Sequence, residues 1–136
     1  MVRSRLPWLL LVPMAFLLLG ARTGPLVDPA PITVPAGLSL KEVSRAIRTV
    51  IATRGWVVSI DEGGKIDAVL NLREHTAHIA IAYDTKEVRP TYVSSENLNY
   101  EEKKGVRYIH RNYLNWMNNV STDITRALQV AAVSRE

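Results

Sequence analysis

The chain has 136 residues, enough for one folded domain, and no cysteine, which excludes disulfides, a thiolate nucleophile and cysteine-ligated metal sites. The formal net charge is +4, but Arg3, Arg5 and Arg22 precede residue 25, and the remaining 14 basic residues nearly balance the 13 acidic ones. Because a nucleic-acid-binding protein concentrates basic residues on its folded part, this distribution argues against a nucleic-acid partner.

Residues 1–22 have the pattern of an export signal or N-terminal anchor. Arg3 and Arg5 precede an uncharged run at residues 6–21, which is short for a membrane span of about 20 residues. Leu-Gly-Ala at positions 19–21 resembles the sequence before the lipidated cysteine of bacterial lipoproteins, but Arg22 stands where that cysteine would be. We therefore expect an exported protein without a lipid, located in the periplasm or on the periplasmic face of a membrane.

Residues 23–37 contain four prolines and a single charged residue. Proline-rich segments are extended and semi-rigid, so this composition predicts a tether between the membrane and a single α+β domain at residues 38–134.

The first helix of that domain is predicted at residues 40–54. Ser39 and Glu42 have the spacing of a capping box at a helix start. Apolar residues then recur at steps of three and four, and Gly55 follows as a stop signal.

Four strands are predicted next, at residues 56–61, 65–73, 76–83 and 88–94. A two-residue turn at positions 74–75 would set Leu70 against Ile79, and a three-residue turn at 62–64 would set Ile60 against Ile66. Pairing Tyr83 with Val88 continues the same apolar face. Pro90 lacks an N–H donor, which suits an edge strand.

A loop at residues 95–105 and a long helix at residues 105–133 complete the domain. The expected fold is a four-stranded antiparallel meander with two helices on one face, in the order α-β-β-β-β-α. The apolar stripe of the last helix consists of Val106, Ile109, Tyr113, Trp116, Val120, Ile124, Leu128 and Ala131.

The three histidines are the candidates for chemistry. His75 and His78 are three residues apart, but they fall in a predicted turn and strand with no third ligand nearby, so we expect no metal site. His110 lies at the border of the helix stripe, where packing is the expected role. We expect no catalytic residue and no cofactor, because the sequence has no nucleophile elbow or phosphate-binding loop.

The densest group of polar and aromatic residues is a candidate ligand site. Such side chains can line a groove for a saccharide or a peptide, but they can also be core aromatics whose polar atoms bond the loop backbone. The candidate ligand-binding residues are Tyr92, Asn97, Tyr100, His110, Asn112, Tyr113 and Trp116.

Four segments together carry a resemblance: Gly55-Trp56 and the stretches at 77–83 (AHIAIAY), 95–100 (SENLNY) and 109–116 (IHRNYLNW). Over residues 32–128 the chain resembles a family of small, uncharacterised Gram-negative envelope proteins, many of them lipoprotein-like. The resemblance implies an exported, periplasm-facing domain with no established activity. The chain departs from the lipoprotein pattern at Arg22.

The leading hypothesis is a non-enzymatic interaction or structural module, held near a membrane by its N-terminus, with an envelope protein or cell-wall component as its partner. One alternative is a ligand-binding module for a cell-wall saccharide or peptide. Another is a small enzyme that uses His75, His78 or His110.

Overall fold

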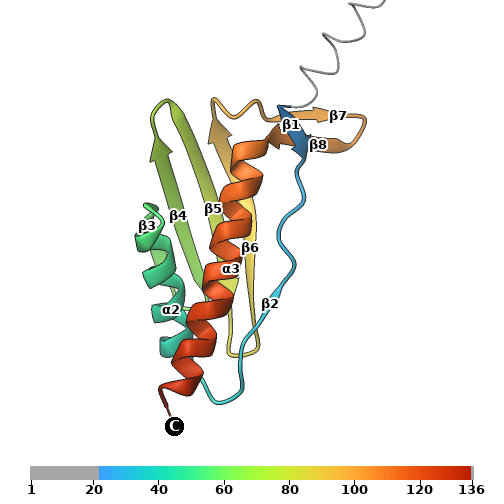
Figure 1. Ribbon diagram of the computed structural model, residues 1–136. Coiled ribbons are helices and arrows are strands. Elements are labelled where there is room, and N and C mark those ends of the chain that lie inside the picture. Colours follow the sequence, from blue (N-terminus) through green and yellow to red (C-terminus); the bar gives the residue numbers. More distant parts are fainter. Residues whose placement is uncertain (1–21, 136) are drawn as a thin grey trace, which may run out of the picture.

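The computed structural model describes residues 22–135, which form two antiparallel sheets and two helices (Figure 1). The predicted α+β class is therefore confirmed. The expected export signal or anchor lies, apart from Arg22, outside the described residues. The larger sheet consists of β2 (Ile32–Thr33), β6 (Glu87–Glu96), β5 (His75–Tyr83), β4 (Lys65–Leu72) and β3 (Val57–Glu62), in that order. The smaller sheet consists of β1 (Thr23–Pro25), β8 (Val106–His110) and β7 (Glu101–Lys103), in that order.

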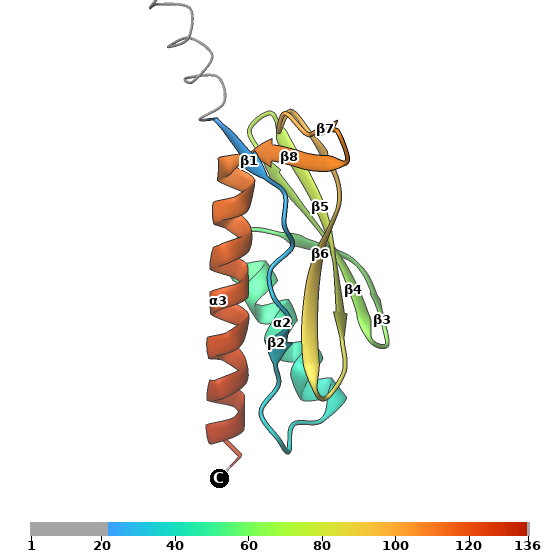
Figure 2. The ribbon, with the colours of Figure 1, turned by 90° about the vertical axis from the view of Figure 1, so that its right-hand side faces the viewer.

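Both helices, α2 (Leu40–Thr53) and α3 (Arg111–Val133), cover the same face of the larger sheet (Figure 2). The other face of that sheet has no covering layer among the described residues. Neither helix in this part of the chain is both long and apolar enough to cross a membrane.

The prediction of a four-stranded sheet was wrong, because β2 adds a fifth strand. Its Ile32 pairs with Val88, so β6 is not an edge strand along its whole length. Beyond this short pairing the outer side of β6 has a different partner, since the carboxylate of Asp28 accepts a hydrogen bond from the backbone N–H of Tyr92. Pro90 lies between these two contacts, where its missing N–H leaves no donor unsatisfied.

The predicted hairpin registers were right in one case and shifted in two. Tyr83 pairs with Val88 as expected. Leu70 pairs with Ala77 rather than Ile79, because the turn lies at Arg73-Glu74, one residue earlier than predicted. The resulting two-residue shift keeps the same side chains on the inner face. In the first hairpin a register irregularity after Val58 pairs Ile60 with Asp67, not with Ile66.

Helix α2 begins and ends as its sequence predicts. The Ser39 side chain accepts from the backbone N–H of Glu42, and the Glu42 carboxylate accepts from the backbone N–H of Ser39. At the other end Gly55 has φ +85°, a conformation that glycine adopts without the steric cost of a side chain.

The last helix begins at Arg111, six residues later than predicted. The residues expected to form a loop and a first helical turn instead form the β7–β8 hairpin, with Lys103 opposite Val106. Lys104 and Gly105, between them, both have positive φ, 51° and 78°. Two consecutive residues with positive φ are typical of a type I′ turn, whose twist matches that of the two strands in a two-residue hairpin.

Residues 23–37, which we call the strap, are part of the domain and not a tether outside it. Leu26, Ile32 and Val34 of the strap are each no more than 6% exposed. The strap is extended, as its prolines predict, but its backbone bonds to the domain: Leu26 N–H donates to the carbonyl of Arg107 at 2.8 Å. The domain therefore includes residues that composition alone had assigned to a linker.

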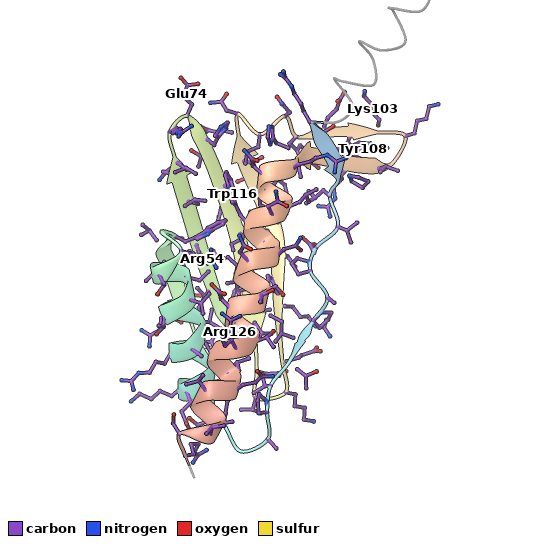
Figure 3. All side chains as sticks on the ribbon, viewed as in Figure 1. Arg54, Glu74, Lys103, Tyr108, Trp116 and Arg126 are labelled. Carbon is purple, nitrogen blue, oxygen red and sulfur yellow. The ribbon has the colours of Figure 1, made fainter. Side chains whose placement is uncertain are left out.

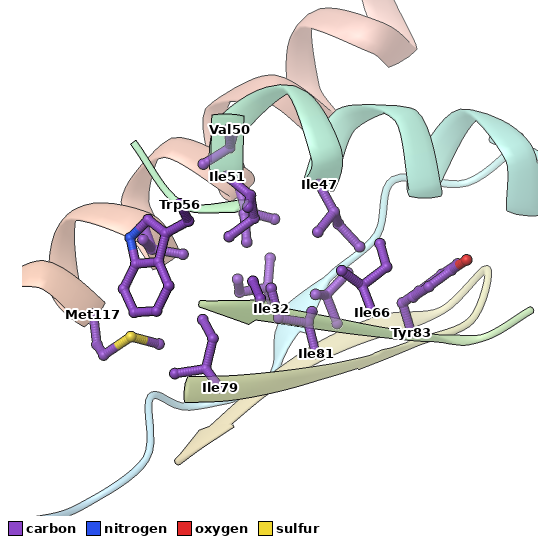
Figure 4. Close-up of a cluster of buried hydrophobic side chains, with 14 of the residues drawn as sticks. Ile32, Ile47, Val50, Ile51, Trp56, Ile66, Ile79, Ile81, Tyr83 and Met117 are labelled. Carbon is purple, nitrogen blue, oxygen red and sulfur yellow. The ribbon is translucent and has the colours of Figure 1, made fainter. Parts of the chain in front are cut away.

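The centre of the core lies between the larger sheet and the two helices (Figure 4). Ile47 and Ile51 of α2 face Ile66 and Ile81 of the sheet, and all four side chains are fully buried. Burial of this apolar surface is the main favourable contribution to the fold, because the chain has no disulfide.

Candidate functional site

Three of the predicted ligand-binding residues form an aromatic cluster beside the start of α3. The ring of Tyr92 stacks on Tyr100, with centroids 5.1 Å apart, and meets the ring of Tyr113 edge-on at 5.5 Å. Tyr113 is 1% exposed. Stacked and edge-on aromatic pairs are both favourable packing geometries. The cluster fills the space between β6 and α3 and leaves only Tyr100 well exposed.

The hydroxyl groups of Tyr92 and Tyr113 in this cluster are held in the neutral form. Burial raises the pKa of Tyr113, and the nearby Asp28 carboxylate raises it further. Burial also raises the pKa of Tyr92, whose hydroxyl shares a hydrogen bond of 2.7 Å with Ser95. The Tyr113 hydroxyl has no hydrogen-bond partner among residues 22–135. These tyrosines are therefore placed for packing and not for proton transfer at neutral pH.

The other predicted residues gather around His75, which the sequence had not grouped with them. Its ring lies 6.4 Å from that of His110 and 6.5 Å from that of Trp116. The Nδ1–H of His75 donates to the carbonyl of Asn97 at 2.7 Å, and the Asn97 side chain donates to the carbonyl of Glu74. These bonds fasten the end of the β4–β5 hairpin to the loop that follows β6.

His110 is the N-cap of α3. Its Nδ1 accepts a hydrogen bond from the backbone N–H of Asn112 at 3.1 Å, so Asn112 takes part through its backbone. A side chain in this position satisfies one of the N–H groups that a helix start leaves unpaired. The seven predicted residues thus form two neighbouring groups, and their role in ligand binding stays a prediction.

Trp116, which is labelled in Figure 3, also lines a hollow of about 230 Å³ together with Trp56 and Leu72. This volume is below the range of about 300–1,000 Å³ that small-molecule sites typically occupy. The hollow is therefore a weak candidate for the groove that the sequence had suggested beside Trp116.

His75 and His78 do not act together. Residues three apart on a strand face opposite sides of the sheet, and His78 lies on the uncovered face. There its Nε2 is 3.9 Å from the carboxylate of Asp67, a residue 9% exposed. Within residues 22–135, no group of three or more potential ligand side chains is placed to hold a metal ion.

A hollow larger than the one beside Trp116 lies between the two helices, and it was not predicted from the sequence. This α2–α3 groove has a volume of about 740 Å³, within the usual range for binding sites. Its apolar lining consists of Ala46, Val50, Ala127, Val130 and Ala131. Its charged rim consists of Glu42, Arg45, Arg54, Asp123, Arg126 and Arg135.

Ion pairs connect the two helices near both ends of the groove. Arg54 of α2 contacts Asp123 of α3 at 2.6 Å, and Arg126 shares that carboxylate at 3.7 Å. At the other end Arg135, just after α3, contacts Glu42 at 3.3 Å. Because α2 and α3 run antiparallel, these pairs frame a stretch of small apolar side chains.

The electrostatics of the rim favour ionised carboxylates. The Arg54 guanidinium holds the pKa of Asp123 below its ordinary range, and the same hydrogen bond raises the pKa of Arg54. Hydrogen bonds from Ser39 in the capping box lower the pKa of Glu42, and Arg135 lowers it further. Both carboxylates of the rim are therefore ionised at neutral pH.

No motif could have pointed to the groove, because it is lined by alanine, valine, threonine and arginine side chains on two helices far apart in sequence. The one exposed large apolar residue that marks it is Val130, 59% exposed, on the outward side of α3.

No match is found to this chain among protein-family models, curated proteins or solved structures.

Proposed function

We propose that this chain is a non-enzymatic, exported envelope protein that binds a partner protein through the α2–α3 groove. The observation that carries the proposal is the groove itself. It combines an apolar lining, an exposed Val130 and a charged rim in a space of about 740 Å³. Binding surfaces of proteins characteristically combine apolar area with arginine side chains.

The side chains of the groove favour binding over catalysis. None of the three histidines lies in its lining, and its carboxylates are engaged with arginines. The hydroxyl of Thr53, which also lines the groove, donates to the carbonyl of Thr49 in its own helix. A general base beside a nucleophile, which acyl or phosphoryl transfer to a side chain would require, is missing from the described lining residues.

The position of the groove suits a protein anchored by its N-terminus. Arg22 lies at the start of α3, where its carbonyl accepts from the backbone N–H of Arg111. The groove lies along the other half of the helix, toward its C-terminus. A helix of 23 residues is about 35 Å long. An anchor preceding Arg22 would leave the groove directed away from the membrane.

Site-specific cross-linking of the full chain in a Gram-negative host tests the proposal. A photoreactive benzoylphenylalanine placed at Val130 should form a discrete protein adduct. The same group at Val57, which is 64% exposed on β3, should form none or a different one. Identical adducts from both positions, or none from Val130, would contradict docking in the groove. Protease that degrades the domain only after the outer membrane is opened would support export.

A further inference from the structure

We infer that the partner segment is an amphipathic helix that carries carboxylates on both sides of its apolar stripe. This inference rests on the proposed function and specifies the chemistry of the partner. It follows from the charge, the shape and the accessible arginine side chains of the α2–α3 groove.

The charge of the groove is unbalanced. Four arginines stand on the rim against two carboxylates, an excess of two positive charges. The described residues as a whole carry 15 basic and 12 acidic side chains. Two of the three excess positive charges of this part of the chain therefore surround one groove, and an acidic partner would compensate them.

Two of these arginines are available to a partner. Arg45 makes no ion pair with any residue from 22 to 135. Arg126 shares Asp123 with Arg54 and has a side chain 72% exposed (Figure 3). Arginine binds carboxylates through two parallel hydrogen bonds, which gives orientation as well as affinity. Arg45 belongs to α2 and Arg126 to α3, so together they would contact a segment in the groove from both sides.

The shape of the groove suits a helix. Glu42 and Arg54, which mark its ends on α2, are twelve residues apart, or about 18 Å along a helix axis. That length accommodates about three turns of a third helix, and the small side chains of Ala46, Ala127 and Ala131 leave room for larger ones from the partner. Docking of an amphipathic helix between two others is a recurring mode of recognition.

Two other occupants have the wrong charge. Residues 1–21 of this chain carry Arg3 and Arg5 and no acidic residue, so they have the same sign as the groove. A second copy would place two positively charged grooves against each other, and such like-charge contacts disfavour association.

The test uses the full chain in nanodiscs of zwitterionic lipid, with empty nanodiscs as the blank. The probe is a labelled 14-residue helical peptide with leucines on one face and glutamates flanking them. A second peptide has lysine in place of every glutamate. Fluorescence anisotropy should show the glutamate peptide binding about tenfold more tightly, equivalent to about 1.4 kcal/mol. The difference should shrink as salt is added.

Charge reversal locates the binding. The double variant Arg45→Glu/Arg126→Glu should prefer the lysine peptide. The matched control, Lys41→Glu/Lys65→Glu, makes the same change of net charge outside the groove and should keep the original preference. Thermal melts should establish that both variants are folded. Equal binding of the two peptides, no binding, or an unchanged preference in the groove variant would overturn the inference.

The cross-link at Val130 separates this inference from the proposed function. An adduct that forms equally well with Arg45→Glu/Arg126→Glu would keep the groove as a docking site and remove the acidic helix as its partner. An adduct that disappears in this variant and persists in the Lys41→Glu/Lys65→Glu control would support both.

Discussion

The two halves of α3 differ in how they are covered. The N-terminal half lies under β1 of the strap and the aromatic cluster, and its Tyr113 is 1% exposed. The C-terminal half buries Ile124 and Leu128 in the core but leaves Val130 59% exposed beside the α2–α3 groove. The N-terminal half of α3 thus makes its apolar contacts within the domain, whereas the C-terminal half keeps an exposed apolar side chain beside the groove.

This difference indicates packing as the role of the N-terminal half and binding as the role of the C-terminal half. The aromatic half looks more like a functional site in the sequence, because tyrosine, tryptophan and asparagine are common in binding sites. In the structure several of its polar side chains bond the domain's own backbone, as His75, Asn97 and His110 do. The half made of alanine, valine and arginine is the one left open.

The largest expected effect contrasts Tyr113 with Val130. Tyr113→Ala should lower the free energy of unfolding by about 3–5 kcal/mol, because it leaves a cavity in the core. Val130→Ala should change it by no more than about 0.5 kcal/mol, since the side chain is mostly exposed. Denaturant unfolding followed by circular dichroism measures both. Equal losses would show that the two halves of α3 are covered alike.

A smaller expected effect on stability tests whether the strap packs over the N-terminal half of α3. Leu26→Ala in the strap should cost about 2–3 kcal/mol, the lower part of the range for buried leucines, because the strap lies near the surface. Val27→Ala is the matched control, 74% exposed, and should cost less than about 0.5 kcal/mol. If Leu26→Ala were as mild as its neighbour, the strap would be a tether after all.

The sequence predicts those parts of the fold that depend on local patterns. The capping box of α2, the alternation in β4 and β5, and the apolar stripe of α3 from Tyr113 onward are local signals. The strap is different, because its pairings with β6 and β8 join residues more than 50 positions apart. Val106 and Ile109 fit the helix stripe by their spacing, so the turn at Lys104-Gly105 was the only sign of a strand.

Prediction of the candidate sites from the sequence is limited in the same way, because it reads residue types and local spacing but not the packing of distant elements. The tyrosines could be grouped from the sequence because each stands out by residue type. The groove could not, since it depends on the antiparallel packing of α2 and α3, which brings Arg54 beside Asp123 and Glu42 beside Arg135. Small side chains make a groove only where two helices leave space between them, and that is a property of the packed pair.

The two halves of α3 should also respond to opposite extremes of pH, and the alkaline response belongs chiefly to Tyr113, the more deeply buried of the two tyrosines whose pKa is raised. Burial raises its pKa in the folded protein, whereas an unfolded tyrosine ionises near pH 10. Its contribution to stability is therefore complete below about pH 10 and is lost as pH rises toward the folded pKa. Tyr113→Phe should reduce this loss and change stability at neutral pH by no more than about 1 kcal/mol, because the hydroxyl has no hydrogen-bond partner within residues 22–135.

Unfolding measured from pH 7 to about pH 11 checks this expectation. Tyr100→Phe removes a hydroxyl from a side chain that is 41% exposed and should leave the alkaline loss as in the wild type. A Tyr113→Phe variant as sensitive as the wild type would place the alkaline response elsewhere.

The smallest effect is the acid response of the groove, through Asp123. Its folded pKa lies below the ordinary value of 3.8, chiefly because of the hydrogen bond from Arg54. The stabilisation that the ionised Asp123 contributes is present above about pH 4 and is lost as pH falls through the folded pKa.

Asp123→Asn should therefore lose less stability than the wild type between pH 5 and about pH 2. Arg54→Gln should behave in the same way, because it removes the other partner of the same ion pair. The Asp123 side chain is partly exposed, so the difference should shrink in high salt. An Asp123→Asn variant with the acid sensitivity of the wild type would mean that the Arg54–Asp123 pair joins the helices without stabilising them.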